Sequence, residues 1–532
     1  MARNSAKGEA SAGTGSGKLG LLIALAMFVL VVDTAIMNVS ISAVARDLDT
    51  TVSGVQAAIA IEALISAAFI LVNSKVGDLI GRKRAYVLGL LAYALGALAM
   101  TLTQNLVSVI IAWAVVGGLG AALLLPAMQA LIHGNFEGAA QRQVYAMVGA
   151  AAAIAAAVGP LIGGVVTTYL SWRVGFLLEV VAIAVILSGI RLVRDVPYTG
   201  SRHIDVVGAL LSIVGMGGLV LGILAWQEGR EFVGALLILG GLGLGALAYW
   251  LVRRERQGKP GLLDPDLLRS PQFRLGISQQ MLQQITLGGA MIVIPIFLQI
   301  ALEYDAMRAG LSIAPLSLSM FFVAMLAGKR AGKRRSAVII RWGFLLSSVG
   351  IALVIPVVPR AESGWALVVP LMIAGTGLGL LVSQLNNYTL APIREERVSE
   401  AAGVNSAAGS FGLSFGLAMG GGIMLATLAI SFTAMSESSE VIPPADQERI
   451  AVALEEDAQV VSDTQLQEVL AGQPQEIQGE ILRINDDARS LSLQVALLVP
   501  LLACLVGLFN AFRMVRLPDV EPTSSAEGTV LG

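Results

Sequence analysis

Charged residues are scarce in this chain of 532 residues, and their scarcity decides the class of protein. They form 14% of the sequence against 56% hydrophobic residues, whereas a soluble domain carries about 25% charge. The apolar residues occur in runs of about 18 or more, the length that an α-helix needs to cross the hydrocarbon of a bilayer. The composition therefore excludes a soluble protein and predicts an all-α polytopic membrane protein.

Aromatic residues, cysteine and histidine are also few. Aromatics form 5% of the chain, while glycine occurs 59 times, which is typical of membrane helices packed closely through small residues. One cysteine, Cys504, and two histidines, His133 and His203, exclude a disulfide framework, an iron–sulfur cluster and a Cys/His zinc site. The net charge of −2 argues against a nucleic-acid partner. We expect no metal, no cofactor and no enzymatic activity, because these two histidines cannot complete a Ser/His/Asp set.

Charge-poor stretches divide the chain into about fourteen membrane-spanning helices. Residues 1–18 resemble the start of a signal peptide. However, Asp33 interrupts the apolar run behind them and no small-residue cleavage site leads into a soluble domain, so we expect a retained first span. The predicted spans are 19–45, 55–74, 85–103, 106–132, 143–169, 174–193, 204–226, 231–252, 273–301, 306–327, 336–358, 364–391, 403–432 and 490–512.

Lysine and arginine indicate how these spans are oriented. If the N-terminus lies in the cytoplasm and the chain alternates, the inner segments hold 27 of the 35 Lys and Arg residues and the outer segments hold 8. Cytoplasmic loops of membrane proteins are enriched in these residues, and an odd number of spans would destroy the bias. We therefore predict a multi-pass protein of the cell membrane with both termini in the cytoplasm.

One connection between spans is long and acidic. Residues Thr433–Arg489 hold Asp or Glu at 13 positions against three arginines. Alternating apolar positions such as Ile450, Val452 and Leu454 indicate short amphipathic helices rather than disorder. The parity of the spans places this segment outside the cell, where it either attracts cations or forms a solvated cap without chemistry.

Three acidic residues stand in the interior of predicted spans, away from their first two residues. A charged side chain at a helix centre costs about 2.5–3.5 kcal/mol in a membrane, so acidic residues at such positions usually have a function. Asp33 lies about 20 Å from either end of the first span, Glu62 lies in the outer half of the second, and Glu179 lies near the outer end of the sixth, where it could reach water. We predict that Asp33, and with it Glu62 and Glu179, couples transport to protons or cations. The alternative for each is a hydrogen-bonded structural acid.

Amide side chains predict the wall of a substrate cavity. Asn38 shares a polar face of the first span with Asp33, and an arc of glutamines lies on the ninth span, where Gln279, Gln283 and Gln284 recur at helical spacing. Amides hydrogen-bond varied ligands without a charge penalty. The alternative is hydrogen bonding between helices. The predicted cavity residues are Asn38, Gln279, Gln283, Gln284, Gln384 and Asn387.

Two further motifs carry mechanical meaning. At the inner end of the second span, Gly81 permits a tight turn beside charged residues that can form and break contacts as a transporter rocks. In the fifth span, a proline among glycines describes a bend packed tightly against a partner helix. The predicted conformational latch is Asp78, Gly81, Arg82 and Lys83, and the bend is Gly159, Pro160, Gly163 and Gly164.

Together these motifs resemble the major facilitator superfamily, and within it the fourteen-span drug:proton antiporter branch that includes quaternary-ammonium and multidrug efflux proteins. Val32-Asp33-Thr34-Ala35-Ile36-Met37-Asn38-Val39 resembles the branch's signature in the first helix. Asp78 to Lys83 resembles the superfamily's loop motif, Gly159 to Gly164 its antiporter motif, and Ser171-Trp172-Arg173 is also typical.

The chain departs from the family pattern at several positions. Ser74 and Leu79 replace a glycine and an arginine of the loop motif, so the latch has one charge fewer. Ala114 stands where the family carries an arginine with a part in proton transfer, which leaves a facilitator without proton coupling as an alternative. Glu62 stands where many relatives have an aromatic residue.

The resemblance implies a major facilitator fold of two six-helix bundles joined by two extra helices. The implied division is a cytoplasmic tail (1–18), an N-terminal bundle (19–194), two linker helices (204–253), a C-terminal bundle (273–432 and 490–514), an acidic outer loop (433–489) and a second tail (515–532). The implied function is export of amphipathic or cationic small molecules by proton antiport, as a monomer among membrane lipids, with the proton gradient as energy source. Export of a lipid-like substrate and, more remotely, a membrane scaffold or sensor are the alternatives.

Overall fold

In the computed structural model, every regular element of the described part of the chain is a helix. This part contains fourteen helices that are long and apolar enough to cross a membrane, which confirms the predicted number of spans. The structure describes residues 2–517 except 137, 196–204, 228–231, 260, 262–264, 330–334, 394–397, 444–446, 448–449, 451–465, 468–469 and 473.

Each predicted span corresponds to one helix or to two or three consecutive helices. The amino-terminal half consists of α1 (Ala2–Asp47), α2 (Val52–Ile80), α3 (Arg82–Met100), α4 (Leu106–Val109), η1 (Ile110–Gly117), α5 (Gly118–Asn135), α6 (Gly138–Tyr169) and α7 (Trp172–Ser188). Next come η2 (Ile190–Leu192), α8 (Val206–Gln227), α9 (Val233–Arg256) and α10 (Pro265–Arg269). The carboxy-terminal half consists of α11 (Pro271–Ile296), η3 (Phe297–Ala301), α12 (Ala306–Lys329), α13 (Ser336–Val357), η4 (Val358–Arg360), η5 (Gly364–Leu367), α14 (Val368–Leu390), α15 (Val398–Glu437), η7 (Leu470–Gly472), α18 (Gln475–Ala496) and α19 (Leu498–Arg516).

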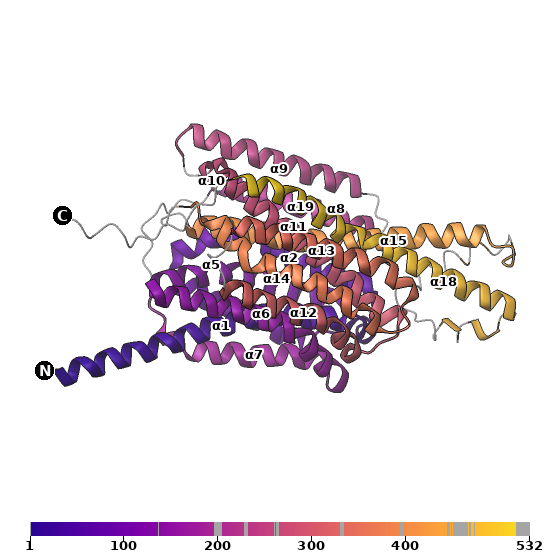
Figure 1. Ribbon diagram of the computed structural model, residues 1–532, viewed down its shortest axis with the longest axis horizontal. Helices are drawn as coiled ribbons and strands as arrows, with labels where there is room; N and C mark the ends of the chain where they lie inside the picture. Colours follow the sequence, from indigo (N-terminus) through magenta and orange to yellow (C-terminus); the bar gives the residue numbers. More distant parts are fainter. Residues whose placement is uncertain are drawn as a thin grey trace.

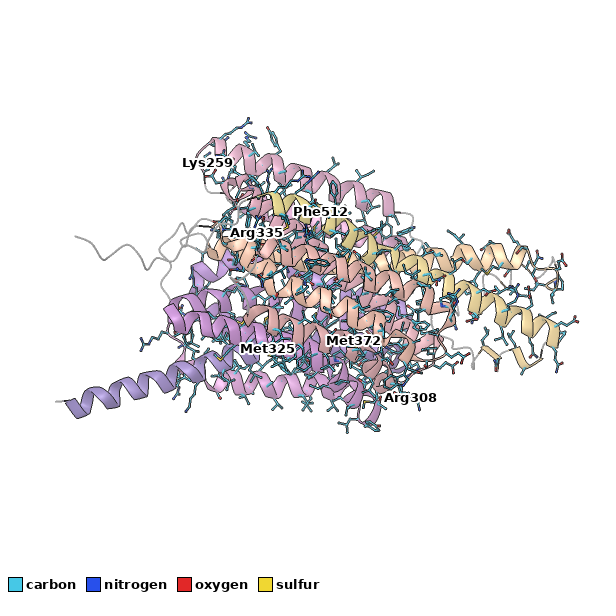
Figure 2. All side chains as sticks on the ribbon, in the orientation of Figure 1. Lys259, Arg308, Met325, Arg335, Met372 and Phe512 are labelled. Atoms are coloured by element: carbon cyan, nitrogen blue, oxygen red, sulfur yellow. The ribbon has the colours of Figure 1, made fainter. Side chains whose placement is uncertain are left out.

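The bundle has two distinct ends. α1 begins and α19 ends at one of them, while α15 and α18 project together beyond the other helices at the opposite end (Figure 1). We call this second end the hairpin end. Figure 2 shows Lys259 and Arg335 toward the end where α1 begins, and Arg308 at the hairpin end. Between the ends, Met372 and Phe512 expose 48% and 50% of their surface, as expected of side chains that face lipid.

Packing within each half differs from packing between the halves. In the amino-terminal half, α1 packs on α6 and α7, and α3 packs on α5 and η1. In the carboxy-terminal half, α11 packs on α15 and α19, and α13 packs on α14 and α19. Between the halves, the most extensive contacts are those of α6 with α12 and of α2 with α15, and α1 also touches α11 and α12. The helices of Asp33 (α1) and Glu179 (α7) therefore pack mainly within the amino-terminal half, whereas the helix of Glu62 (α2) also packs extensively on α15.

Helices α8 and α9 form a pair that follows the amino-terminal half. α8 also packs on α2 and α15, whereas α9 lies at the edge of the molecule (Figure 1). The pair is tied at one end by Asp205, whose carboxylate accepts a hydrogen bond from Trp250 Nε1 at 3.0 Å and lies 3.8 Å from Arg254. A buried charge with these two partners holds the two helices in register.

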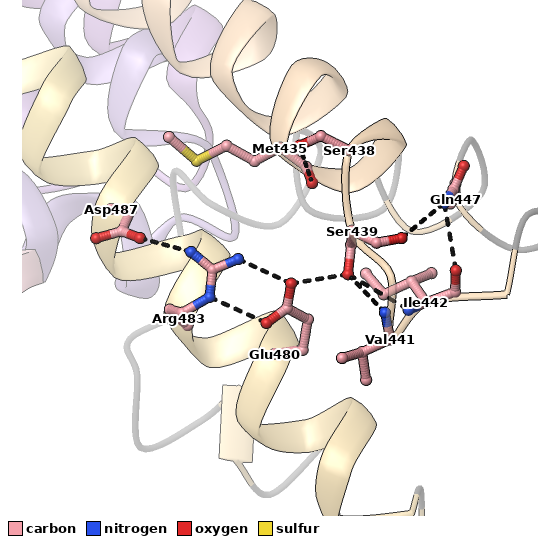
Figure 3. Close-up of polar contacts among 9 residues, drawn as sticks. All are labelled: Met435, Ser438, Ser439, Val441, Ile442, Gln447, Glu480, Arg483 and Asp487. Atoms are coloured by element: carbon pink, nitrogen blue, oxygen red, sulfur yellow. Dashed lines mark hydrogen bonds and ion pairs between the residues drawn. The ribbon is translucent and has the colours of Figure 1, made fainter.

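The acidic connection differs from its predicted form. α15 continues to Glu437 and α18 starts at Gln475, so both ends of residues 433–489 extend spans instead of forming separate short helices. Apolar residues at helical spacing explain this, because Ile481, Ile484 and Ala488 face α15 and are buried with Phe432. On the outer side, Arg483 bonds Glu480 at 2.8 Å and Asp487 at 2.9 Å, and Ser439 donates to Glu480 at 2.7 Å (Figure 3). Val452 and Leu454 lie outside the described residues.

The first helix also differs from its predicted bounds. α1 begins at Ala2, so residues 1–18, predicted as a tail, are largely helical and project from the bundle (Figure 1). The apolar part that could span the membrane begins at Gly17, close to the predicted start. Alanine and charged residues among the glycines of this segment continue the helical turn beyond the apolar span.

Candidate functional site

Three helices of the amino-terminal half bring the three predicted acidic residues together. Asp33 on α1, Glu62 on α2 and Glu179 on α7 are 1%, 8% and 3% exposed. The Asp33 carboxyl group interacts electrostatically with those of Glu62 and Glu179. Glu179 therefore does not reach toward water as its place near the helix end predicted, because its side chain turns inward to Asp33.

Asp33 is held by two aromatic hydrogen-bond donors. The hydroxyl group of Tyr93 on α3 donates to Asp33 Oδ2, and Trp113 Nε1 donates to Oδ1 and Oδ2 at 3.0 and 2.8 Å. Both aromatic side chains are buried. The sequence analysis missed them, although a polar tip on an aromatic ring inside an apolar span is a sign that a partner lies nearby.

Trp113 reaches Asp33 from an irregular stretch of the fourth span. Residues Ile110–Gly117 form the π-helix η1, in which one turn is wider than in an α-helix. Ala114, which stands at the arginine position of the family pattern that the sequence resembles, is fully buried in the same stretch. In this chain the Asp33 carboxylate therefore meets a neutral indole donor.

An aromatic cluster closes the site on one side. Trp113 meets Phe176 edge-on, with 6.4 Å between ring centroids, and Phe176 meets Trp172 in the same way at 6.0 Å. Phe176 precedes Glu179 by one helical turn on α7. Because these rings exclude water from that side, hydrogen bonds and charges beside them act in a low dielectric.

The acidic cluster has no countercharge among the described residues. None of its three carboxyl groups forms an ion pair with a described lysine, arginine or histidine. The carboxyl oxygens of Glu179 are buried and receive no hydrogen bond from a described N–H or hydroxyl donor, so the Asp33 carboxyl group is their polar neighbour. Three carboxylates cannot all be charged at such a site unless something positive joins them. The cluster is thus suited to bind protons, a cationic ligand, or each in turn.

The glycine-rich bend of α6 brings three helices close together. A Cβ atom on Gly163 would lie 2.9 Å from Ile36 Cα of α1, and one on Gly164 would lie 2.9 Å from Met307 Cα of α12. The Pro160 carbonyl group lies against Gly310 of α12. Side chains larger than hydrogen have no room at these positions, so the bend lets α6 contact the Asp33 helix on one side and the other half on its opposite side.

The predicted latch makes its described contacts within its own half. Gly81 has a φ of +99°, which forms the tight turn between α2 and α3. Lys83 donates its backbone N–H to Asp195 Oδ1 at 3.1 Å and its Nζ to the Val193 carbonyl at 2.7 Å. The Asp78 side chain lies outside the described residues, and Arg82 is half-buried at the start of α3. Asp195, which the sequence analysis missed, thus caps α3 from the segment after η2.

The Ser171-Trp172-Arg173 motif anchors the start of α7 at the hairpin end. Trp172 Nε1 donates to Asp47 Oδ2 at 3.1 Å, and the Arg173 guanidinium group pairs with the same carboxylate. Arg173 also donates to the Thr103 carbonyl at 2.7 Å. The motif therefore joins the ends of α1, α3 and α7. It thereby fixes how far Glu179 lies from the hairpin end along α7.

The structure separates the predicted cavity amides into two groups. Gln279 is fully buried and donates to the Gly507 carbonyl of α19 at 2.9 Å, and Gln384 accepts from Ser336 Oγ of α13 at 3.0 Å. Both pairs lie within the carboxy-terminal half, so these two amides make the hydrogen bonds between helices that were the alternative to a cavity role. The residues next to Gln279 and Gln384 in the sequence do not indicate which helix each amide would bond.

The remaining amides keep polar atoms available. Asn38 donates to the Thr34 carbonyl at 2.9 Å, but its Oδ1 is buried without a partner, as is Oε1 of Gln284. Gln283 is 3% exposed, and Asn387 is exposed at the end of α14. Of the predicted set, Asn38, Gln284 and also Gln279, through its Oε1, keep a buried oxygen able to accept a hydrogen bond from a ligand.

Hydrogen bonds join the two halves toward the hairpin end. Ser414 Oγ donates to the Ala60 carbonyl at 2.7 Å. The backbone N–H of Ser42 donates to Gln299 Oε1 at 3.2 Å, and the N–H of Met307 donates to Thr168 Oγ1 at 3.1 Å. These three hydrogen bonds connect the two halves on the side of the hairpin end.

Comparison with known proteins gives a consistent picture. A family model described as Major Facilitator Superfamily matches residues 23–417. The chain is 26% identical over 415 residues to the probable actinorhodin transporter of Streptomyces coelicolor, covering 76% of this chain and 71% of that one. It is 27% identical to the multidrug resistance protein Stp of Mycobacterium tuberculosis (76% and 75% covered) and 25% identical to the multidrug export protein EmrB of Escherichia coli (74% and 78% covered).

Solved structures share the fold at low sequence identity. A transporter of the POT family, PepTSo, is similar with a TM-score of 0.61, 12% identity and coverage of 93% of this chain and 98% of that one. A bacterial homologue of the human lysosomal transporter Spinster is similar with a TM-score of 0.57, 14% identity and coverage of 94% and 98%. The family model, which matches well over half of the chain, shows together with the fourteen apolar helices of the described residues that the chain belongs to the Major Facilitator Superfamily and is a multi-pass transporter of the cell membrane, not an enzyme.

Proposed function

We propose that the protein exports amphipathic small molecules, cationic ones among them, in exchange for protons. The relatives named above for multidrug resistance, multidrug export and actinorhodin transport support export as the direction. The observation that carries the exchange is the buried cluster of Asp33, Glu62 and Glu179 without a basic partner among the described residues. Both termini lie in the cytoplasm in this proposal, so the hairpin end faces outward.

Exchange follows from competition for one negative site. Protons and a cationic substrate both neutralise the cluster, and each weakens the other's binding because the same carboxylates serve both. Tyr93 and Trp113 hold Asp33 in one orientation, so that a proton taken from outside is released at a fixed position. Glu179 accepts or returns a proton beside it, and Glu62 meets the positive group of the substrate.

Alternating access supplies the direction of transport. In this conformation the three cross-half bonds close the hairpin end. Each of these hydrogen bonds contributes about 0.5–1.5 kcal/mol to stability. The free-energy cost of a buried, unpaired charge is several kcal/mol, so a change in the charge of the acidic cluster can outweigh all three bonds. Protonation and substrate binding then shift the population between a state open to the cytoplasm and a state open to the outside. The transporter works as a monomer, with both halves in one chain.

The proposal is tested by transport in proteoliposomes with an imposed pH gradient. The wild-type protein is expected to move a fluorescent lipophilic cation such as ethidium against its gradient. Asp33→Asn is expected to abolish this proton-driven movement while ethidium binding to the purified protein persists. Undiminished proton-driven transport by Asp33→Asn would remove this residue from the coupling role.

A facilitator without proton coupling is the second candidate function. The observation that favours it is Ala114, fully buried at the arginine position of the family pattern that the sequence resembles. In the same proteoliposomes, a facilitator would equilibrate ethidium at a rate that does not respond to the pH gradient. A flat response of the wild-type protein would therefore favour this candidate over exchange.

A further inference from the structure

Arginine and phenylalanine side chains share one lipid-facing surface near the end of the bundle where α1 begins. On α19, Phe509, Phe512 and Arg513 lie on one side of the helix at helical spacing, and all three are exposed. The neighbouring helix α13 places the Arg341 guanidinium group over the Phe512 ring, with 5.5 Å between its central carbon and the ring centroid. The Arg513 guanidinium group lies over the Phe509 ring in the same way at 4.9 Å. We call these four side chains, Arg341, Phe509, Phe512 and Arg513, the arginine patch.

The arginine patch lies short of the end of α19, beside side chains that face lipid. Phe509 and Phe512 precede Arg516, the last residue of α19, by about 10 Å and about 6 Å along the helix axis. The Arg513 side chain therefore leans back over the preceding turn, toward the apolar part of the span. Trp342 of α13 is 49% exposed, and exposed tryptophan in membrane proteins is enriched at the level of the lipid headgroups. Both guanidinium groups thus lie where headgroups meet hydrocarbon.

The two arginines of the patch have no anionic partner in the described part of the chain. Neither Arg341 nor Arg513 forms an ion pair or a hydrogen bond with a described residue. By contrast, Arg254 of α9, at the same end of the molecule, lies 3.8 Å from the Asp205 carboxylate. A positive charge beside hydrocarbon is costly without an anion. The anion that a bilayer supplies at this level is the phosphate of its lipids.

Contacts between α13 and α19 hold the arginine patch in shape. Arg335, at the start of α13, donates to the Leu517 carbonyl just after α19 at 2.7 Å. A Cβ atom on Gly507 of α19 would collide with the Phe344 ring of α13, so the two helices lie directly against each other. Attraction between a guanidinium group and a ring face uses the charge and not the N–H donors. The donors of both patch arginines therefore stay available to an anion.

We propose that the arginine patch binds the headgroup of an anionic phospholipid such as phosphatidylglycerol. The guanidinium groups of Arg341 and Arg513 donate to the phosphate oxygens, whose geometry matches their paired N–H groups. The acyl chains lie against the exposed rings of Phe509 and Phe512. The lipid comes from the inner leaflet if the orientation proposed above holds, but binding at this surface depends neither on export nor on exchange at Asp33.

Native mass spectrometry of the purified protein tests this lipid site. The protein is released from mixed micelles with equal amounts of phosphatidylglycerol and phosphatidylcholine, and the lipids that stay bound are identified by mass. We expect the wild-type protein to retain phosphatidylglycerol in preference to phosphatidylcholine. A basic residue at a membrane surface strengthens the binding of anionic lipid about fivefold. Arg341→Gln and Arg513→Gln are therefore each expected to lower the retained phosphatidylglycerol by about this factor, and the double variant is expected to lower it further.

Matched variants separate the arginine patch from general attraction to positive charge. Arg191 is exposed on η2 at the same end of the molecule and lies over no described aromatic ring, so Arg191→Gln is expected to retain phosphatidylglycerol as the wild type does. Phe509→Leu keeps every charge and is expected to lower retention, though less than Arg513→Gln. Because Arg513 is exposed, Arg513→Gln carries the test alone if Arg341→Gln does not fold. Equal retention of the two lipids by the wild type, or equal effects of Arg191→Gln and Arg513→Gln, would overturn the proposal.

A soluble phosphate is the other source of the same anionic group. Glycerol 3-phosphate carries the phosphate of the lipid without its acyl chains. A large excess of it is expected to leave phosphatidylglycerol bound to the wild-type protein, because the chains contribute to binding at the exposed rings. Displacement of the lipid by glycerol 3-phosphate would contradict a lipid site.

Discussion

At the scale of single residues, Asp33 depends on two neighbours that carry no charge. The Tyr93 hydroxyl and the Trp113 indole both donate to its carboxylate, inside a cluster that has no basic partner among the described residues. Neutral donors stabilise a carboxylate less than an arginine would and leave room for a positive ligand. The replacement of arginine by Ala114 is thus compatible with a coupled transporter in which protons and substrate alternate as the countercharge.

Removing either donor is expected to slow transport without unfolding the protein. Trp113→Phe and Tyr93→Phe each delete one hydrogen bond to a charged group, worth about 1.5–3 kcal/mol. We expect a loss of about tenfold or more in proton-driven ethidium transport for each variant, measured in proteoliposomes at equal protein content. Binding of ethidium is expected to change less than its transport.

Tyr86→Phe is the matched control for these two variants. Tyr86 is on α3, two turns before Tyr93, and its buried hydroxyl group has no hydrogen-bond partner. Its removal is expected to leave transport unchanged. If Tyr86→Phe and Tyr93→Phe behave alike, the Tyr93 hydrogen bond has no part in transport.

Sequence patterns predicted the acidic residues better than their partners. Asp33, Glu62 and Glu179 were recognisable because a charge inside an apolar run is costly. The interhelical hydrogen bonds of Gln279 and Gln384 could not be predicted, because a helical arc gives the direction of a side chain only relative to its own helix. Their partners, Gly507 and Ser336, lie on helices that are far away in the sequence.

At the scale of helices, the bend of α6 sets the distance between the two halves. The Gly164 backbone touches that of α12 so closely that a Cβ atom would lie 2.7 Å from the Ala306 carbonyl oxygen. Because two backbones are in contact there, the clash cannot be relieved by turning a side chain. The closed hairpin end is therefore sensitive to a single methyl group.

Gly164→Ala is expected to shift the population away from the closed hairpin end. Ser53, which lines a small pocket between the two halves at the hairpin end, can report this after conversion to cysteine. We expect Ser53→Cys to react several-fold faster with a membrane-impermeant maleimide when Gly164→Ala is present. Gly149→Ala on the same helix is the control, because a Cβ atom there meets nothing within 4 Å. Equal reactivity in the two backgrounds would contradict the role of Gly164.

Helix ends and irregular turns were the least predictable elements. Hydropathy located all fourteen spans, but it gave no indication of the π-helices η1 and η3, which place Trp113 and Gln299. Hydropathy also placed the ends of the spans at the first polar residues. In the structure, α15 and α18 continue beyond those residues as a hairpin with its own buried apolar cluster. These features depend on contacts between helices, which a window along one sequence does not contain.

At the scale of the whole molecule, the orientation of the bundle follows from its charges. The excess of Lys and Arg in the segments at the end where α1 begins predicts that this end is cytoplasmic. Cys504 is the single cysteine of the chain and is fully buried, so introduced cysteines can be labelled with little background. An impermeant maleimide added to intact cells is expected to label Ala361→Cys at the hairpin end and to leave Gln257→Cys at the other end unlabelled. The reverse pattern would contradict export as the direction of transport.

Proton release on substrate binding tests the exchange proposal most directly. The purified protein in weakly buffered detergent, with a pH indicator, is mixed with ethidium, with a neutral drug and with a lipid. Wild-type protein is predicted to release protons as the cation binds, and both Asp33→Asn and Glu179→Gln are predicted to release fewer. Saturable binding of ethidium to the wild-type protein with no proton release at any pH between 5 and 8 would contradict a shared acidic site.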